Sequence, residues 1–222
     1  MNIGIIGAGN IGGNLTRALT ATGHQVRVAN SRGPQTLADL AQETGASAVP
    51  AGQAALGADL VVVTVPLKSV PALGPAVLDV LPDGGVVVDT GNYYPQRDGR
   101  IEEIEAGMPE TVWTARTLDP AGRLRWVKAF NGIRAEHLVT AARRPGDPER
   151  RALPVAADDA EARALVTGLV EQLGFDVVDA GPLAESWRQQ PGTPVYGAEA
   201  GAEGIREALA AATPEHSQRF RA

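Results

Sequence analysis

The chain of 222 residues contains no cysteine. This absence excludes disulfide bonds, thiolate metal sites, cysteine nucleophiles and iron–sulfur clusters. Histidine is scarce as well, because the three histidines are scattered along the chain and lack the spacing of metal ligands. We therefore expect neither a metal centre nor a catalytic histidine motif in this protein.

Aromatic residues are also few, at 4% of the chain, although hydrophobic residues make up 44%. We expect alanine, valine and leucine to fill the core of one large domain or two small ones. A net charge of −6 argues against nucleic acids and anionic membranes as partners. No apolar run approaches the length of a membrane span, and an apolar strand that begins at the second residue leaves no room for a signal peptide. These features predict a cytoplasmic protein.

The most informative segment is a glycine-rich turn, Gly7–Gly12, which follows this short strand and precedes an amphipathic helix. In a G-x-G-x-x-G motif, the first glycine permits a tight turn, the second lets the backbone approach a pyrophosphate, and the third lets the helix pack closely on the strand. The unpaired N–H groups of the first helical turn then face the bound anion. We predict a dinucleotide site whose contacts in this turn are Gly7, Gly9, Asn10, Ile11 and Gly12.

The end of the second strand predicts which nucleotide binds. An NAD site usually places an aspartate or glutamate about 20 residues beyond the glycines, where it binds the ribose hydroxyls. This chain has Asn30, Ser31 and Arg32 instead, so no carboxylate repels a phosphate and a guanidinium is available to bind one. Together with Thr36, these residues form a predicted 2′-phosphate pocket, which favours NADP over NAD. The alternative is an ordinary turn with a solvent-exposed arginine.

Strand-like and helix-like segments alternate through the first half of the chain. The apolar runs at 59–65 and 85–89 are typical of strands covered on both faces, and the apolar spacing at 34–43 and 70–81 predicts helices. A strand at 126–130 is expected to rejoin the sheet after an irregular stretch rich in glycine and proline. Because crossovers between parallel strands are right-handed, this pattern predicts an α/β fold with a doubly wound parallel sheet, the Rossmann arrangement.

A turn-rich, charged stretch at Pro145–Pro148 divides the chain. We assign residues 1–142 to an NADP-binding Rossmann domain and residues 143–222 to a small C-terminal α/β segment that contributes to the substrate site and to a homodimer contact. The elements predicted beyond the turn are a strand at 153–157, a helix at 159–173, a strand at 175–178 and a helix at 201–212. Hydroxyacid dehydrogenases and pyrroline carboxylate reductases append an all-helical domain instead, which counts against both classes.

Five short segments together resemble one family of enzymes. The segments are Gly7–Gly12, Asn30–Arg32, Thr64–Pro66, Val127–Asn131 and Asp179–Leu183. Their combination is similar to the NADP oxidoreductases that use the deazaflavin coenzyme F420, and also to the cytoplasmic reductase domain of the STEAP metalloreductases. The resemblance covers nearly the whole chain. It implies that the nicotinamide and the deazaflavin stack at the carboxyl edge of the sheet and that hydride passes directly between them.

The resemblance also implies roles for individual residues. It places the pyrophosphate against Gly9–Gly12 and the 2′-phosphate against Ser31 and Arg32. The residues that it implies along the adenine ribose and the nicotinamide are Thr64, Val65 and Pro66, and those near the reacting rings are Asn131, Gly132 and Ile133. Two segments depart from the family pattern. Residues 33–36 lack the further basic side chains of archaeal members, and the loop at 91–99 does not match them, so the identity of the electron acceptor stays open.

Further candidates lie near the carboxyl ends of the later strands. Asn92, Tyr93 and Tyr94 follow one strand at the edge where α/β proteins bind ligands. They can form a stacking wall for a flavin-like ring, or the two aromatic residues can simply pin a loop. Lys128 either approaches the nicotinamide carboxamide or extends along the sheet edge into solvent. Asp89 is expected to have a structural role, either capping a helix or binding a loop amide.

Two groups nearer the C-terminus have two interpretations each. A set of arginines either recognises the acidic tail of a deazaflavin or, as we favour, forms a solvated charged run. These arginines are Arg143, Arg144, Arg150 and Arg151. The irregular stretch after residue 183 contributes either a dimer contact or a pocket wall. Its candidate residues are Glu185, Trp187, Arg188 and Tyr196.

The sequence therefore predicts an NADP(H)-dependent oxidoreductase that transfers hydride to or from coenzyme F420 or a flavin such as FMN or FAD. Such a reaction needs aligned rings but neither a nucleophile nor a metal, because the cofactors supply the chemistry. No residue is assigned a catalytic role. Two alternatives stay open: an NADPH-dependent flavin or ferric reductase on the same scaffold, and a protein that senses NADP(H) by binding it without turnover.

Overall fold

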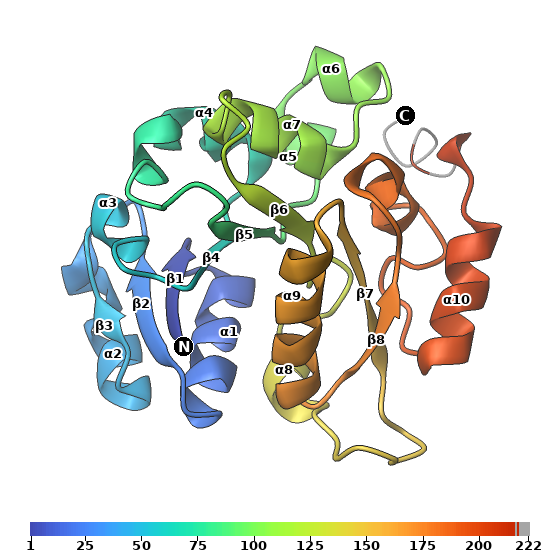
Figure 1. The fold of residues 1–222 in the computed structure, drawn as a ribbon, viewed down its shortest axis with the longest axis horizontal. Coiled ribbons are helices and arrows are strands. Elements are labelled where there is room, and N and C mark those ends of the chain that lie inside the picture. The colour runs from blue at the N-terminus through green and yellow to red at the C-terminus, as the bar shows by residue number, and fades with distance from the viewer. Residues whose placement is uncertain (216, 218–222) are drawn as a thin grey trace.

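The structure is a computed structural model that describes residues 1–215 and 217. Within this part of the chain, eight strands form one sheet in the order β3-β2-β1-β4-β5-β6-β7-β8, with helices on both faces (Figure 1). The strands are β1 (Asn2–Ile6), β2 (Gln25–Ala29), β3 (Ser47–Ala48), β4 (Leu60–Val63), β5 (Val86–Asp89), β6 (Arg125–Lys128), β7 (Ala152–Ala157) and β8 (Asp176–Asp179). Neighbouring strands run parallel except β6 and β7. The predicted α/β fold is confirmed.

The helices form two layers. They are α1 (Asn10–Ala21), α2 (Ala38–Thr44), α3 (Ala51–Ala54), α4 (Val70–Leu73), α5 (Pro95–Asp98), α6 (Glu102–Glu105), α7 (Glu110–Leu118), α8 (His137–Thr140), α9 (Ala160–Gln172) and α10 (Ala202–Ala211). Short 3₁₀ segments are η1 (Pro34–Leu37), η2 (Leu67–Ser69), η3 (Pro75–Val77) and η4 (Leu183–Gln189). The core on one face is built with α1, α8 and α9, and the cores on the other face with α3, α4, α7 and α10. Among the described residues, no helix combines the length and the apolar character needed to cross a membrane.

The alternation of side chains along β1 explains how both layers attach to the central strand. Ile3 and Ile5 belong to the core under α1, and Ile6 belongs to the core under α3. Gly4 also faces α3, and a Cβ there would lie 2.4 Å from the carbonyl oxygen of Ala54. The backbone of α3 therefore lies directly on β1, and only glycine fits between them. This packing fixes the strand from which the glycine-rich turn begins.

The prediction of one helix at 70–81 is wrong. The structure has the single turn α4, then Gly74 at φ 64° and ψ 164°, then the 3₁₀ turn η3. Pro71 and Pro75 each lack an N–H group, and the backbone at Gly74 is not helical. The apolar residues with helical spacing therefore belong to two separate turns and not to one helix. The helix predicted at 34–43 is likewise divided, into η1 and α2.

The C-terminal part of the chain continues the same sheet, because β7 pairs with β6 (Figure 1). Arg150 fastens the turn before β7. Its buried guanidinium lies 2.8 Å from the carboxylate of Asp176 and donates a hydrogen bond of 2.7 Å to the carbonyl oxygen of Phe175. Arg151 pairs with Glu199 at 2.7 Å. Arg150 is therefore structural, which corrects both interpretations for this residue, whereas the ion pair of Arg151 is partly exposed. The division of the chain at residue 142 stays a prediction.

Candidate functional site

Three glycines shape the turn between β1 and α1, each for its own reason. Gly7 has a φ of 110°, and a Cβ there would lie 2.3 Å from the carbonyl oxygen of Thr64, just beyond β4. A Cβ on Gly12 would lie 1.9 Å from the carbonyl oxygen of Gly7, so α1 packs directly on the turn. A Cβ on Gly9 would meet no described atom within 4 Å. The turn therefore leaves open space before the first N–H groups of α1, as a pyrophosphate requires.

An open cavity of about 390 Å³, called here the β2-side cavity, lies between this turn and the turn after β2. Its wall also includes residues of α3 and α4. The predicted cofactor contacts on this wall are Gly7, Gly9, Asn30, Ser31, Arg32, Thr64, Val65 and Pro66. The structure thus brings the predicted phosphate pocket and the glycine-rich turn to one continuous space.

The turn after β2 is braced by its own side chains. The Oδ1 atom of Asn30 accepts the backbone N–H of Arg32 at 2.9 Å, and its Nδ2 atom donates to the hydroxyl of Thr36 at 2.9 Å. That hydroxyl in turn donates to the carbonyl oxygen of Gly33 at 2.8 Å. Thr36 therefore supports Asn30 and does not itself line the cavity. The exposed guanidinium of Arg32 has no hydrogen bond or ion pair within the described chain, so it is available to bind a phosphate.

A second cavity of about 390 Å³, the β6-side cavity, lies on the other side of the glycine-rich turn. It shares Gly9 and Thr64–Pro66 with the β2-side cavity, so the two meet at the turn. The other predicted site residues on its wall are Asn10, Ile11, Asn92, Tyr94, Asn131 and Ile133. Sequence reasoning missed Thr90, Gly91, Arg97 and Ala135, although three of these follow β5 at the ligand-binding edge. A dinucleotide crossing Gly9 would have one half in each cavity.

Two residues predicted for the acceptor pocket do not line it. Tyr93 is fully buried, and its hydroxyl lies 2.8 Å from the carboxylate of Glu105 and accepts the N–H of Ile101 at 3.1 Å. Successive side chains of extended backbone point in opposite directions, so Tyr93 pins the loop while Tyr94 faces the cavity. Gly132 instead accepts the N–H of Gly197 through its carbonyl oxygen at 3.1 Å. The loop-pinning alternative therefore holds for Tyr93, and the stacking of a ring against Tyr94 stays a prediction.

Tyr94 meets Tyr196 across the β6-side cavity, and their hydroxyl groups are joined by a hydrogen bond. The guanidinium of Arg97 lies 4.7 Å from the centre of the Tyr94 ring, pairs with Asp98 at 2.8 Å, and donates to the carbonyl oxygen of Asn92 at 2.6 Å. Burial and the hydrogen bond with Tyr196 raise the pKa of Tyr94 well above its usual range. The phenol is therefore neutral at physiological pH. Tyr196 is a wall residue, in keeping with one of its two sequence interpretations.

Asn131 ties the end of β6 to two other segments. Its Nδ2 atom donates to Oδ1 of Asn92 at 3.0 Å and to the carbonyl oxygen of Gln189 at 2.6 Å. Asn92 returns a hydrogen bond of 2.8 Å to the carbonyl oxygen of Asn131. The preceding residue, Phe130, has a φ of 60°, a conformation that costs energy for a bulky residue and is often found at functional sites. This network holds one wall of the β6-side cavity in place.

Lys128 is fully buried, which rules out the predicted extension into solvent. Its ammonium lies 3.6 Å from the carboxylate of Asp89 and 3.7 Å from that of Glu110, and it donates to the carbonyl oxygen of Gly91. Asp89 also accepts the N–H of Gly91 at 2.9 Å, so its predicted role in binding a loop amide is confirmed. Lys128 does not line either cavity. It joins β6, β5 and α7 beneath the loop that begins at Gly91, which is a structural role.

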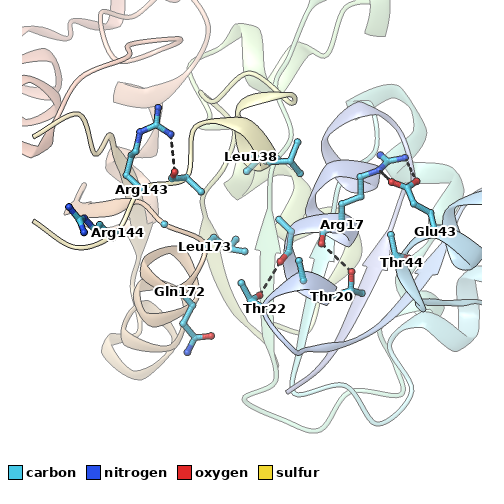
Figure 2. Close-up of a pocket in the computed structure, with 15 residues that line it drawn as sticks. Arg17, Thr20, Thr22, Glu43, Thr44, Leu138, Arg143, Arg144, Gln172 and Leu173 are labelled. Atoms are coloured by element: carbon cyan, nitrogen blue, oxygen red, sulfur yellow. Dashed lines mark hydrogen bonds and ion pairs between the residues drawn. The ribbon is translucent and has the colours of Figure 1, made fainter. Parts of the chain in front are cut away.

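A larger cavity of about 700 Å³ lies at the opposite end of α1. Figure 2 shows Arg17 paired with Glu43 on its wall, with Thr22 at the end of α1 and Gln172 at the end of α9 nearby. Carbonyl groups at the carboxyl ends of helices disfavour a phosphate, so this cavity does not suit the nucleotide. In the described part of the chain, no three histidine, aspartate or glutamate side chains gather as metal ligands.

Comparisons with known proteins agree with this geometry. A model of the family described as NADP oxidoreductase, coenzyme F420-dependent, matches residues 2–93. The hypothetical protein SMa0349 from Sinorhizobium meliloti, known from a crystal structure, is 32% identical in sequence to this chain. The match covers 89% of this chain and 93% of SMa0349, and the two structures superpose with a TM-score of 0.74. A protein of Arthrobacter sp. FB24, named as an F420-dependent NADP reductase, is 25% identical over 84% of this chain and 87% of its own, with a TM-score of 0.67.

A shorter match involves protein YjhV of Escherichia coli strain K12. The two are 49% identical over 51 residues, which is 23% of this chain. The matched region spans only 37% of the length of YjhV. This similarity therefore concerns a part of each protein, whereas the two crystal structures extend over most of both chains.

Proposed function

The chain belongs to the family of coenzyme F420-dependent NADP oxidoreductases, and we propose that it transfers hydride between NADP(H) and the ring of coenzyme F420 or a flavin. It is an NAD(P)-dependent oxidoreductase. The observation that carries the finer proposal is the pair of cavities that meet at Gly9. One cavity leads to an exposed arginine beyond β2, and the other leads to an aromatic, amide-lined wall beyond β5 and β6.

The residues of the β2-side cavity fit NADP. The space at Gly9 and the N–H groups of α1 would hold the pyrophosphate. Ser31 and Arg32 would hold the 2′-phosphate, because a guanidinium is always charged and binds phosphate through two N–H groups. Within the stretch that follows β2, no carboxylate occurs before Asp39. The fit therefore favours NADPH over NADH.

The residues of the β6-side cavity fit a polar ring. Bound NADPH would supply the hydride from its nicotinamide, and the protein would align the two rings and exclude water. Tyr94 and Ile133 offer surfaces for stacking, and Asn92 and Asn131 present a rigid amide wall. F420, FMN and FAD all carry a ring with polar edges, so this wall supports the proposal for any of them. No residue here acts as a nucleophile.

The proposal is tested by anaerobic oxidation of NADPH with F420, FMN, FAD, riboflavin and a ferric chelate in parallel, with NADH as the matched donor. We expect oxidation with at least one ring acceptor and a clear preference for NADPH. Rapid reduction of a flavin or a ferric chelate, without reaction with F420, would select the flavin or ferric reductase alternative. Tight binding of NADPH without oxidation by any acceptor would contradict the proposal and favour a sensor.

A further inference from the structure

We infer that the hydroxyl pair of Tyr94 and Tyr196 is the hydrogen-bond donor that stabilises negative charge on the reduced acceptor ring. The inference rests on the proposed function, since it requires a ring acceptor in the β6-side cavity. The pair is formed by two segments that lie far apart in the sequence, one after β5 and one after η4, and both tyrosines line this cavity. Sequence reasoning assigned no group to this task.

The negative charge on the acceptor ring arises because a hydride carries an electron pair. The C4–H bond of NADPH breaks with its electron pair, a new bond to hydrogen forms on the central ring of the acceptor, and NADP⁺ is left. The acceptor thereby gains a negative charge on its N1–C2 carbonyl edge. A preorganised donor placed at such an edge favours the charged product without transferring a proton, and this type of electrostatic stabilisation is usually a large part of enzymatic rate enhancement.

The hydrogen-bonding capacity of the pair suits this role. Two phenols carry two O–H protons, and the bond between them uses one, so when Tyr94 donates to Tyr196 the hydroxyl of Tyr196 can donate to a ligand. Arg97, the charged residue on the same wall, is already engaged by Asp98 and by the carbonyl oxygen of Asn92. It stacks on the Tyr94 ring and so positions the pair.

The environment keeps the phenol of Tyr94 protonated. Burial and the hydrogen bond between the phenols raise the pKa of Tyr94. A raised pKa means that the neutral phenol persists to more alkaline pH than usual. Tyr94 therefore remains able to donate to Tyr196 throughout the physiological range, which a histidine with an ordinary pKa would not.

The test compares Tyr196→Phe with wild type and with Tyr93→Phe, which removes a hydroxyl one residue from Tyr94 but outside the cavity. Each protein is saturated with the unreactive tetrahydro form of NADPH. Affinities for oxidised and reduced F420 are then measured by anaerobic equilibrium dialysis, with FMN in its place if the acceptor panel selects a flavin. We expect Tyr196→Phe to weaken binding of the reduced ring about tenfold, because hydrogen bonds to charged groups are worth about 1.5–3 kcal/mol.

The same variant should change binding of the oxidised ring by less than about twofold, and Tyr93→Phe should leave the ratio of the two affinities at the wild-type value. An unchanged ratio in Tyr196→Phe, or an equal loss of both affinities, would overturn the inference. Tyr94→Phe provides a second variant if Tyr196→Phe does not unfold cooperatively. Wild-type turnover with an unchanged Tyr196→Phe ratio refutes this inference alone, whereas absence of wild-type turnover with every ring acceptor refutes the proposed function and this inference together.

Discussion

We expect the choice of nucleotide to depend on Arg32, because its exposed guanidinium lines the β2-side cavity and is not engaged elsewhere in the described chain. A charge-assisted hydrogen bond contributes about 1.5–3 kcal/mol. We expect Arg32→Ala to weaken NADPH binding about tenfold or more and to leave NADH binding nearly unchanged, as measured by fluorescence titration. Arg116→Ala, at an exposed position on α7, is the matched control. Equal losses for both nucleotides in Arg32→Ala would contradict the assignment.

Gly9 tests whether the dinucleotide crosses the glycine-rich turn. Its backbone angles, φ −75° and ψ −161°, are accessible to any residue, and a Cβ there meets no described atom within 4 Å. Gly9→Val should therefore fold cooperatively but abolish NADPH binding, because its side chain fills the space of the pyrophosphate. Calorimetric titration and denaturant unfolding measure the two effects. Gly168→Val, at an equally open position in α9, should keep wild-type affinity. Wild-type affinity in Gly9→Val would place the cofactor elsewhere.

At the scale of elements, the ion pairs of Lys128 join β6 to β5 and α7. Removing one partner of a buried ion pair costs about 3–5 kcal/mol, because the remaining charges are left in a low-dielectric interior. We expect Lys128→Met to lower the free energy of unfolding by this amount in urea titrations. Lys68→Met alters an exposed lysine and should change stability by less than about 0.5 kcal/mol. Equal midpoints for the two variants would show that the buried ion pairs do not stabilise the sheet.

The elements differ in how well the sequence predicts them. The strands β4 and β5 are readable because burial on both faces gives continuous valine runs, and the glycine-rich turn is readable because each glycine has a local steric cause. The interruption between α4 and η3 is harder to predict. The apolar residues there have the spacing of one continuous helix, but Pro71 and Gly74 disfavour continuous helical backbone. The partner of Tyr94 is not predictable at all from local pattern, because Tyr196 is 102 residues away and the two meet only in the folded structure.

For the molecule as a whole, we expect the rate of hydride transfer to vary little with pH. The two described histidines are His24 and His137, and neither of them lines the β2-side or the β6-side cavity. The pKa of Tyr94 is raised, so its phenol stays protonated throughout the physiological pH range and loses its proton only at more alkaline pH than usual. Single-turnover rates measured by stopped-flow absorbance should therefore be nearly constant between about pH 6 and 8. A large single-step change of the rate between these pH values would contradict this expectation and would indicate that an ionisable group takes part in a proton-coupled reduction.

We propose that hydride passes directly from NADPH, held across Gly9, to a ring in the β6-side cavity. The most direct measurement is an anaerobic single turnover with NADPH deuterated at C4, each of the two positions being labelled in a separate sample. Direct transfer gives a primary isotope effect for one of the two labels. It also leaves this deuterium on the ring carbon of F420, or lets it exchange with water from the ring nitrogen if the acceptor is a flavin. Absence of an isotope effect with both labels, in a turnover that product release cannot mask, would contradict it.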